Sequence, residues 1–156
     1  MYEYYIKLVK ESGLVFSYLV LDEIYTFTEK KSKKCYIWTC VGQTSTGRKF
    51  YFYHLSKRKN IDSLIDFNLN LPKAKQYFSD GNFTYENVYG KNIITQKSKI
   101  TNLVKNLNSQ IRDKISYLVR KTKTHSKSFD WLNDRLSMFF VNLNLKGKLN
   151  NTKYII

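Results

Sequence analysis

Residues 16–28 read FSYLVLDEIYTFT, a run rich in β-branched and aromatic side chains that predicts a β-strand. Two similar runs follow it at residues 34–43 (KCYIWTCVGQ) and 48–55 (RKFYFYHL). Short polar turns, KKSK at residues 30–33 and TSTG at residues 44–47, separate the three runs. This spacing predicts a three-stranded antiparallel meander at the start of the domain.

Helical and strand-like segments alternate after the meander. They are predicted at residues 60–71 (helix, with Asn60 as N-cap), 74–81 (strand, ending at Asp80), 82–88 (brief helix), 91–95 (strand), 100–122 (long helix) and 129–143 (final helix). The long helix carries one apolar stripe, formed by Ile100, Leu103, Val104, Leu107, Ile111, Ile115 and Leu118. This order of elements predicts a mixed α/β domain. Residues 1–15 are interpreted as a leader, and residues 145–156 as a tail without a clear pattern.

The composition favours one folded domain without a membrane segment. The chain has 156 residues, of which 42% are hydrophobic and 16% aromatic. Charged residues interrupt every apolar run before it reaches about 18 residues, the length that a membrane-spanning helix needs. The N-terminal segment lacks the pattern of a secretory signal, and Cys35 and Cys40 have no metal-ligand partners nearby in the sequence. A reduced, cytoplasmic location is therefore expected.

The net charge of +15 favours a nucleic-acid partner. Only five of the 27 basic residues are Arg, however, and Asn, Ile, Tyr and Phe are abundant. An AT-rich genome produces the same bias toward Lys, so composition alone leaves both explanations open. The sequence has no RRM or KH signature, which makes RNA recognition the weaker hypothesis.

Two of the twelve acidic residues stand out by their position. Asp22 lies inside an otherwise apolar strand, and Asp80 lies at the carboxyl end of another. Burying a carboxylate is costly unless it is paired or bound to metal. Backbone donors at strand ends and turns are one way to satisfy both side chains. The other is that the two strands bring the aspartates together to hold divalent metal ions, as two-metal phosphoryl-transfer sites require.

Several segments resemble the catalytic region of insertion-sequence-one family transposases, in order and over residues 20 to 144. They are LDEIYTF (21–27), KKCYIWTC (33–40), TSTGRKF (44–50), FSDGNFTY (78–85) and NSQIRDKISYLVRKTKTHSKS (108–128). The resemblance implies a ribonuclease-H-like fold over residues 16–144, with a mixed sheet that includes the meander and is flanked by helices. It also implies DDE chemistry with Mg²⁺ or Mn²⁺, in which water cleaves a phosphodiester at the element end and the freed 3′-hydroxyl attacks target DNA. Double-stranded DNA is then the expected partner, a second copy of the chain is a further candidate, and the location is the prokaryotic nucleoid.

The resemblance makes Asp22 the first catalytic acid and Asp80 the second. The third is a Glu three residues before Asn108, and that position holds Lys105. Glu86 lies where the family places no ligand. Asp113 lies eight residues after Lys105, about 12 Å further along a helix, and cannot serve the same metal pair.

Two placements of the Lys105 side chain stay open on the sequence. Its ammonium either pairs with Asp22 and Asp80 and competes with metal, or it points into solvent. In both cases the third ligand is missing. The sequence therefore predicts a transposase with impaired catalysis, or alternatively a non-catalytic DNA-binding derivative that modulates transposition.

A basic segment supplies the candidate DNA contacts. Its members are Arg112, Lys114, Arg120, Lys121, Lys123 and Lys127. They either neutralise phosphates or form a solvated helix end whose cations suit the helix dipole. Full-length members of the family also carry an N-terminal zinc finger and helix-turn-helix. The short leader cannot hold either, so the chain resembles the downstream reading frame alone or a truncated copy.

Overall fold

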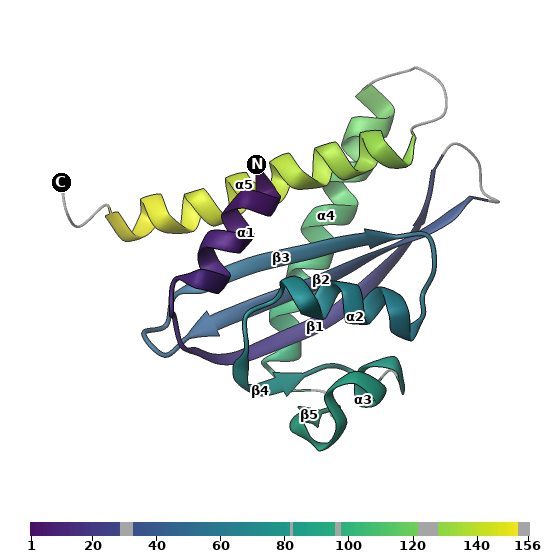
Figure 1. Ribbon diagram of the computed structural model, residues 1–156. Helices are drawn as coiled ribbons and strands as arrows, with labels where there is room; N and C mark the ends of the chain where they lie inside the picture. Colours follow the sequence, from purple (N-terminus) through teal and green to yellow (C-terminus); the bar gives the residue numbers. More distant parts are fainter. Residues whose placement is uncertain (29–32, 82, 96–97, 122–127, 153–156) are drawn as a thin grey trace.

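The computed structural model describes residues 1–28, 33–81, 83–95, 98–121 and 128–152, and it is a mixed α/β protein (Figure 1). A five-stranded sheet has the order β3-β2-β1-β4-β5. Its strands are β1 (Phe16–Phe27), β2 (Lys34–Thr44), β3 (Lys49–Ser56), β4 (Ala74–Phe78) and β5 (Ile93–Ile94). The helices are α1 (Tyr2–Glu11), α2 (Ile61–Asn70), α3 (Phe83–Tyr89), η1 (Gly90–Asn92), α4 (Thr101–Lys121) and α5 (Phe129–Thr152).

The predicted meander is confirmed. Strand β1 pairs antiparallel with β2, and β2 pairs antiparallel with β3. Strands β4 and β5 then add in parallel on the other side of β1, which makes the sheet mixed. The predicted turn at residues 30–33 lies outside the described residues except for its last member.

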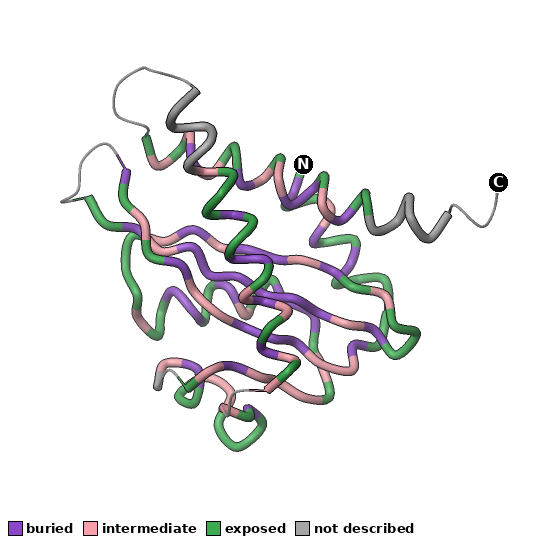
Figure 2. The backbone as a smooth tube through the Cα atoms, turned by 180° about the vertical axis from the view of Figure 1, so that it is seen from behind, coloured by how far each residue is buried: buried purple, intermediate pink, exposed green. Residues whose placement is uncertain are grey.

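Helices cover both faces of the sheet, so its central strands are buried on both sides. Helix α4 crosses one face over β1 and β2, and α2 lies on the other face, as the opposite views of Figures 1 and 2 show. Consecutive residues of β2 from Ile37 to Val41 are buried, although they point alternately to the two faces. Strand β2 therefore reads as a nearly continuous apolar run rather than as an alternating one.

The first 15 residues were interpreted as a leader, but in the structure they are part of the fold. They contain helix α1, which packs Tyr2, Ile6 and Val9 into the core. The Tyr2 hydroxyl accepts a hydrogen bond of 2.7 Å from the backbone N–H of Tyr53 on β3. The spacing of these three side chains, four and then three residues apart, is helical and was already present in the sequence.

The final helix also differs from its prediction, because α5 runs to Thr152 instead of ending at residue 143. The part of α5 beyond residue 143 includes Asn144, which contacts the sheet. Its side-chain amide donates to the carbonyl of Tyr51 at 2.9 Å, and its oxygen accepts the Tyr51 N–H at 2.9 Å. Tyr51 lies on β3, the edge strand of the sheet, so Asn144 satisfies backbone groups that no neighbouring strand reaches.

The smaller elements match their predictions with shifted ends. Strand β5 has two residues where residues 91–95 were expected, and β4 ends at Phe78 instead of Asp80. The segment after β4 still runs beside β5, because the N–H of Ser79 donates to the carbonyl of Ile94 at 3.0 Å. Gly81 follows with a φ of +107°, a left-handed conformation that suits glycine, and it turns the chain away from the sheet.

Candidate functional site

The parallel pairing of β1 with β4 brings the two predicted aspartates together. Val20 of β1 is in register with Phe78 of β4. Asp22 and Asp80 each lie two residues further along, and side chains two residues apart share a face of the sheet. Their carboxylates consequently point to the same side, toward α4, from segments that are distant in sequence.

Helix α4 places Lys105 between these carboxylates. The Lys105 Nζ lies 2.7 Å from Asp80 Oδ2 and 3.6 Å from Asp22 Oδ2. The hydrogen bond to Asp80 is the main cause that raises the pKa of Lys105, and the charge of Asp22 adds to it. Of the two placements that the sequence left open, the structure has the ion-paired one.

Asp22 is held by fixed donors on both of its oxygens. Its Oδ1 accepts the backbone N–H of Glu23 at 2.9 Å, and its Oδ2 accepts the Asn108 amide at 2.9 Å. Only 12% of the side chain is exposed. Burial raises the pKa of Asp22, and the nearby charge of Asp80 raises it further, while the Glu23 N–H and Lys105 act in the opposite direction. The fold thus holds the Asp22 carboxylate in one position and also shifts its pKa.

Thr39 is a site residue that the sequence reasoning missed. It lies on β2 directly opposite Asp22, and its hydroxyl donates to the Asn108 Oδ1 at 2.7 Å. Both Thr39 and Asn108 are buried. The hydroxyl fixes the orientation of the Asn108 amide, so that the amide NH₂ is directed at Asp22. The signal in the sequence was a threonine in the middle of the apolar run of β2.

Glu23 follows Asp22 in the chain but belongs to the other face of the sheet. Its carboxylate accepts the Tyr85 hydroxyl at 2.5 Å and pairs with the Lys59 ammonium at 2.9 Å. The Tyr85 ring is fully buried and packs edge-on against Trp38. Glu23 therefore cannot join Asp22 and Asp80 as a third ligand.

The side chains at the carboxylate pair do not fit a two-metal centre. One oxygen of each aspartate, Oδ2 in both, contacts the Lys105 ammonium. Across the residues that the structure describes, no three His, Cys, Asp or Glu side chains converge on one point. Two-metal centres need several carboxylates, whereas here the Lys105 ammonium contacts an oxygen of each of the two aspartates. The arrangement joins β1, the segment after β4, and α4 through one shared cation.

The predicted DNA contacts are described only in part. Arg112 and Lys114 are exposed on α4. Arg120 and Lys121 belong to the same helix, but their side chains lie outside the described part of the structure, as do the whole of Lys123 and Lys127.

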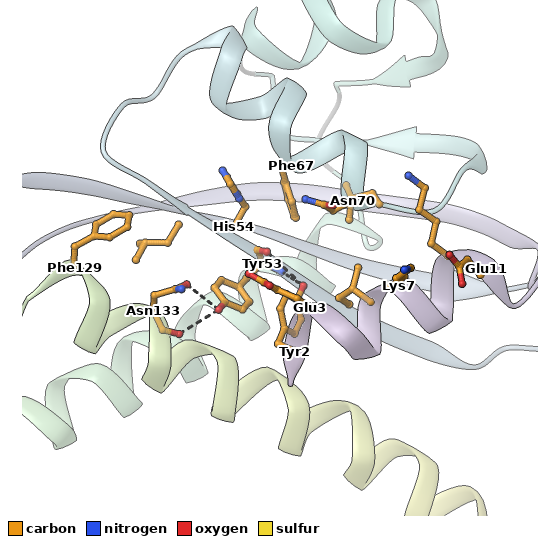
Figure 3. Close-up of a pocket in the computed structure, with 14 residues that line it drawn as sticks. Tyr2, Glu3, Lys7, Glu11, Tyr53, His54, Phe67, Asn70, Phe129 and Asn133 are labelled. Atoms are coloured by element: carbon orange, nitrogen blue, oxygen red, sulfur yellow. Dashed lines mark hydrogen bonds between the residues drawn. The ribbon is translucent and has the colours of Figure 1, made fainter.

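A separate cavity of about 880 Å³ lies among α1, α2, β3 and the start of α5 (Figure 3). Its lining includes Tyr2, Tyr53 and Phe67, and it contains neither aspartate of the carboxylate pair nor Lys105. The Tyr53 hydroxyl donates to the Asn133 Oδ1 at 2.9 Å, and His54 stacks on Phe67. Burial lowers the pKa of His54. These contacts hold α1, α2 and α5 against β3.

No model of a known protein family matches the chain, and no curated protein matches it either. Among the helices in the described part of the chain, none is both long and apolar enough to cross a membrane.

Proposed function

We propose that the chain is the catalytic region of an insertion-element transposase with a ribonuclease-H-like fold, and that its strand-cleaving activity is impaired. The sequence motifs shared with that family carry the first part of the proposal. The mixed sheet with its antiparallel meander is consistent with it. So is the convergence of Asp22 and Asp80 on the face that α4 covers, since the family uses these two positions as its first two acids.

One observation carries the second part, namely the Lys105 ammonium within reach of both carboxylates. A glutamate at this position would give the site three negative charges, whereas the lysine leaves it with one. A divalent ion must then displace a bound ammonium from its own ligands before it can bind. The residues present bind and orient one another, and none of them supplies a step of strand cleavage in this arrangement.

The test compares the natural chain with Lys105→Glu and Lys105→Gln. Calorimetry with Mn²⁺ is expected to detect binding by Lys105→Glu, and little or none by the natural chain. Lys105→Gln is the matched control, because it removes the ammonium without adding a ligand. Nicking of supercoiled plasmid in Mg²⁺ or Mn²⁺ is expected to be absent for the natural chain.

Two outcomes would contradict the proposal. Metal-dependent nicking by the natural chain would remove the claim of impairment. A Lys105→Glu variant that keeps the native circular dichroism spectrum but binds no Mn²⁺ would remove the assignment of position 105 as the third acid.

The ion pair also favours a second candidate, a non-catalytic DNA-binding derivative that modulates transposition. A neutralised carboxylate site repels phosphates less than an acidic one, and the chain carries a net charge of +15. Duplex binding without cleavage is expected, weakening as salt is raised. Neutralising Arg120 and Lys121 to Gln should reduce the slope of log K against log salt by about 2 if both contact phosphates. Neutralising Lys7 and Lys75, which lie on α1 and β4, is the matched control. Absence of DNA affinity at low salt would eliminate this candidate.

A further inference from the structure

Helix α2 presents an acidic and apolar surface in a strongly basic protein. Ile61, Ile65 and Leu69 are spaced four residues apart and are all exposed, Leu69 to 61%. This spacing places them on one side of the helix, opposite the buried Leu64 and Phe67 side. The helix also carries two aspartates, Asp62 and Asp66, and no Lys or Arg. We call Ile61, Asp62, Ile65, Asp66 and Leu69 the α2 stripe.

A cleft of the opposite character runs between α4 and α5. Its cavity of about 320 Å³ is lined by the apolar side chains of Met138, Phe139 and Leu143. Lys114, Arg135 and Lys146 line it as well and give it a positive charge. We call these six residues the α4–α5 cleft.

The α4–α5 cleft extends further along α4. A second cavity, of about 180 Å³, shares Gln110 and Leu143 with the first and reaches Lys49 on β3. Two adjoining cavities of this kind suit the apolar side of one short helix.

We infer that the α2 stripe of one copy docks into the α4–α5 cleft of a second copy. The stripe spans nine residues, which is about 12 Å of helix over eight steps of 1.5 Å, and it offers apolar side chains to an apolar floor. Its two aspartates meet a cleft lined by three cations. Opposite charges at the edge of such a contact select the partner and its orientation.

The chemistry of the two surfaces favours protein over DNA as the occupant. Lys114, Arg135 and Lys146 would attract phosphates. Phosphates do not bind apolar side chains, so Met138 and Phe139 at the floor of the cleft would contribute nothing to DNA binding.

The α2 stripe has two aspartates and no basic residue of its own, and the Lys10 ammonium of α1 donates to the Leu69 carbonyl at its end. The stripe therefore offers phosphates little attraction. A second copy provides a partner of complementary charge and apolar character for each of the two surfaces. Neither surface includes Asp22, Asp80 or Lys105.

The placement of the two surfaces determines the kind of assembly. Helix α2 lies on one face of the sheet and α4 on the other, as Figures 1 and 2 show. Two different surfaces on opposite faces make a head-to-tail contact, which adds further copies instead of closing as a two-fold dimer. Dimers, trimers and longer species are therefore expected together.

Sedimentation velocity on the full, DNA-free chain tests the inference. The natural chain is expected to gain mass with concentration beyond the dimer. Ile65→Asp, which disrupts the α2 stripe, and Arg135→Glu, which disrupts the α4–α5 cleft, are each expected to remain monomeric. Mixed together, the two variants should form a 1:1 heterodimer that grows no further, because only one intact stripe and one intact cleft remain to pair. Leu8→Asp is the matched control, since Leu8 is exposed on α1 outside both surfaces, and it should assemble like the natural chain.

A reciprocal charge exchange gives an independent check. Asp66→Lys alone should weaken assembly, and combining it with Arg135→Glu in one chain should restore it. A natural chain that stays monomeric at every concentration overturns the inference, and so does a variant mixture that stays monomeric. If Arg135→Glu lowers DNA affinity without changing the assembly, the cleft is a nucleic-acid surface and the inference is wrong.

Discussion

Asp22 and Glu23 are neighbours on β1, yet they belong to two regions with different charge balance. Glu23 faces the α3 side, where its carboxylate meets the ammonium of Lys59 and the hydroxyl of the buried Tyr85. Asp22 faces the α4 side, where two carboxylates share the single ammonium of Lys105. The alternation of side chains along a strand is what separates them.

The different charge balance around Glu23 and Asp22 distinguishes a structural ion pair from a candidate functional site. The Glu23 carboxylate is paired with the Lys59 ammonium, and the packing of Tyr85 against Trp38 holds α3 against the sheet. Among the described residues, the two carboxylates of the Asp22 region share one ammonium, from a lysine whose side chain is 42% exposed. The first region should therefore matter most for stability, and the second for ligand binding and pH response.

Tyr85→Ala should have the largest effect and would test the structural character of the Glu23 region. The ring is fully buried against Trp38, and its removal leaves a cavity and deprives Glu23 of a donor. We expect a loss of about 3–5 kcal/mol in the free energy of unfolding, measured by urea denaturation. Tyr4→Ala is the control, because Tyr4 is exposed on α1. Equal losses from the two substitutions would contradict the role of Tyr85.

Asn108→Ala tests the buried donors of the Asp22 region. The substitution removes a hydrogen bond to Asp22 and the shorter hydrogen bond of the Thr39 hydroxyl, which keeps only its contact of 3.3 Å to the Asp22 carbonyl. A loss of about 1–3 kcal/mol in unfolding free energy is expected. Adding Thr39→Val should recover part of that loss, since it removes a buried hydroxyl whose remaining hydrogen bond is long. Ser109→Ala, at an exposed position of the same helix, should change stability by less than about 0.5 kcal/mol.

Lys105→Met and Lys59→Met compare the two regions directly. Their side chains are similarly exposed, 42% and 39%, so the number of carboxylates that each contacts is the main difference. We expect a loss of about 1 kcal/mol for Lys105→Met and about half of that for Lys59→Met, both within the range of exposed ion pairs. Chemical denaturation at low and high salt measures both. A larger loss of unfolding free energy for Lys59→Met than for Lys105→Met would show that contact with two carboxylates does not make a lysine more stabilising than contact with one.

The pH dependence of the Lys105 contribution should be the smallest effect. The folded state raises the pKa of Lys105 above its ordinary value of 10.5. Its contribution to stability is then fully present below pH 10.5 and is lost as the pH rises through the higher folded pKa. The difference in unfolding free energy between the natural chain and Lys105→Met should stay constant from neutral pH to that limit and shrink above it. A difference that grows in alkaline solution would contradict the assigned ion pair.

The elements whose signal is local could be predicted from the sequence. The β-branched runs predicted the meander, the apolar stripe predicted α4, and the isolated Asp22 and Asp80 were recognisable as unusual. It also limited Lys105 to two placements. These features depend on the spacing of side chains within one segment, which the chain carries whether or not it is folded.

Contacts between residues that are distant in the sequence depend on the packing of the folded chain. The parallel register of β1 and β4 made Asp22 and Asp80 neighbours, and the crossing of α4 turned Lys105 toward them instead of toward solvent. Thr39 became a site residue because β2 placed it opposite Asp22.

Helix α1 was missed although Tyr2, Ile6 and Val9 have helical spacing, because so short a helix is marginal until it packs against β3. The end of α5 was missed because the partner of Asn144, the backbone of Tyr51, is distant in the sequence. Local spacing assigns side chains to a face of a strand or helix, but which residues of two distant segments meet depends on how those segments pack together.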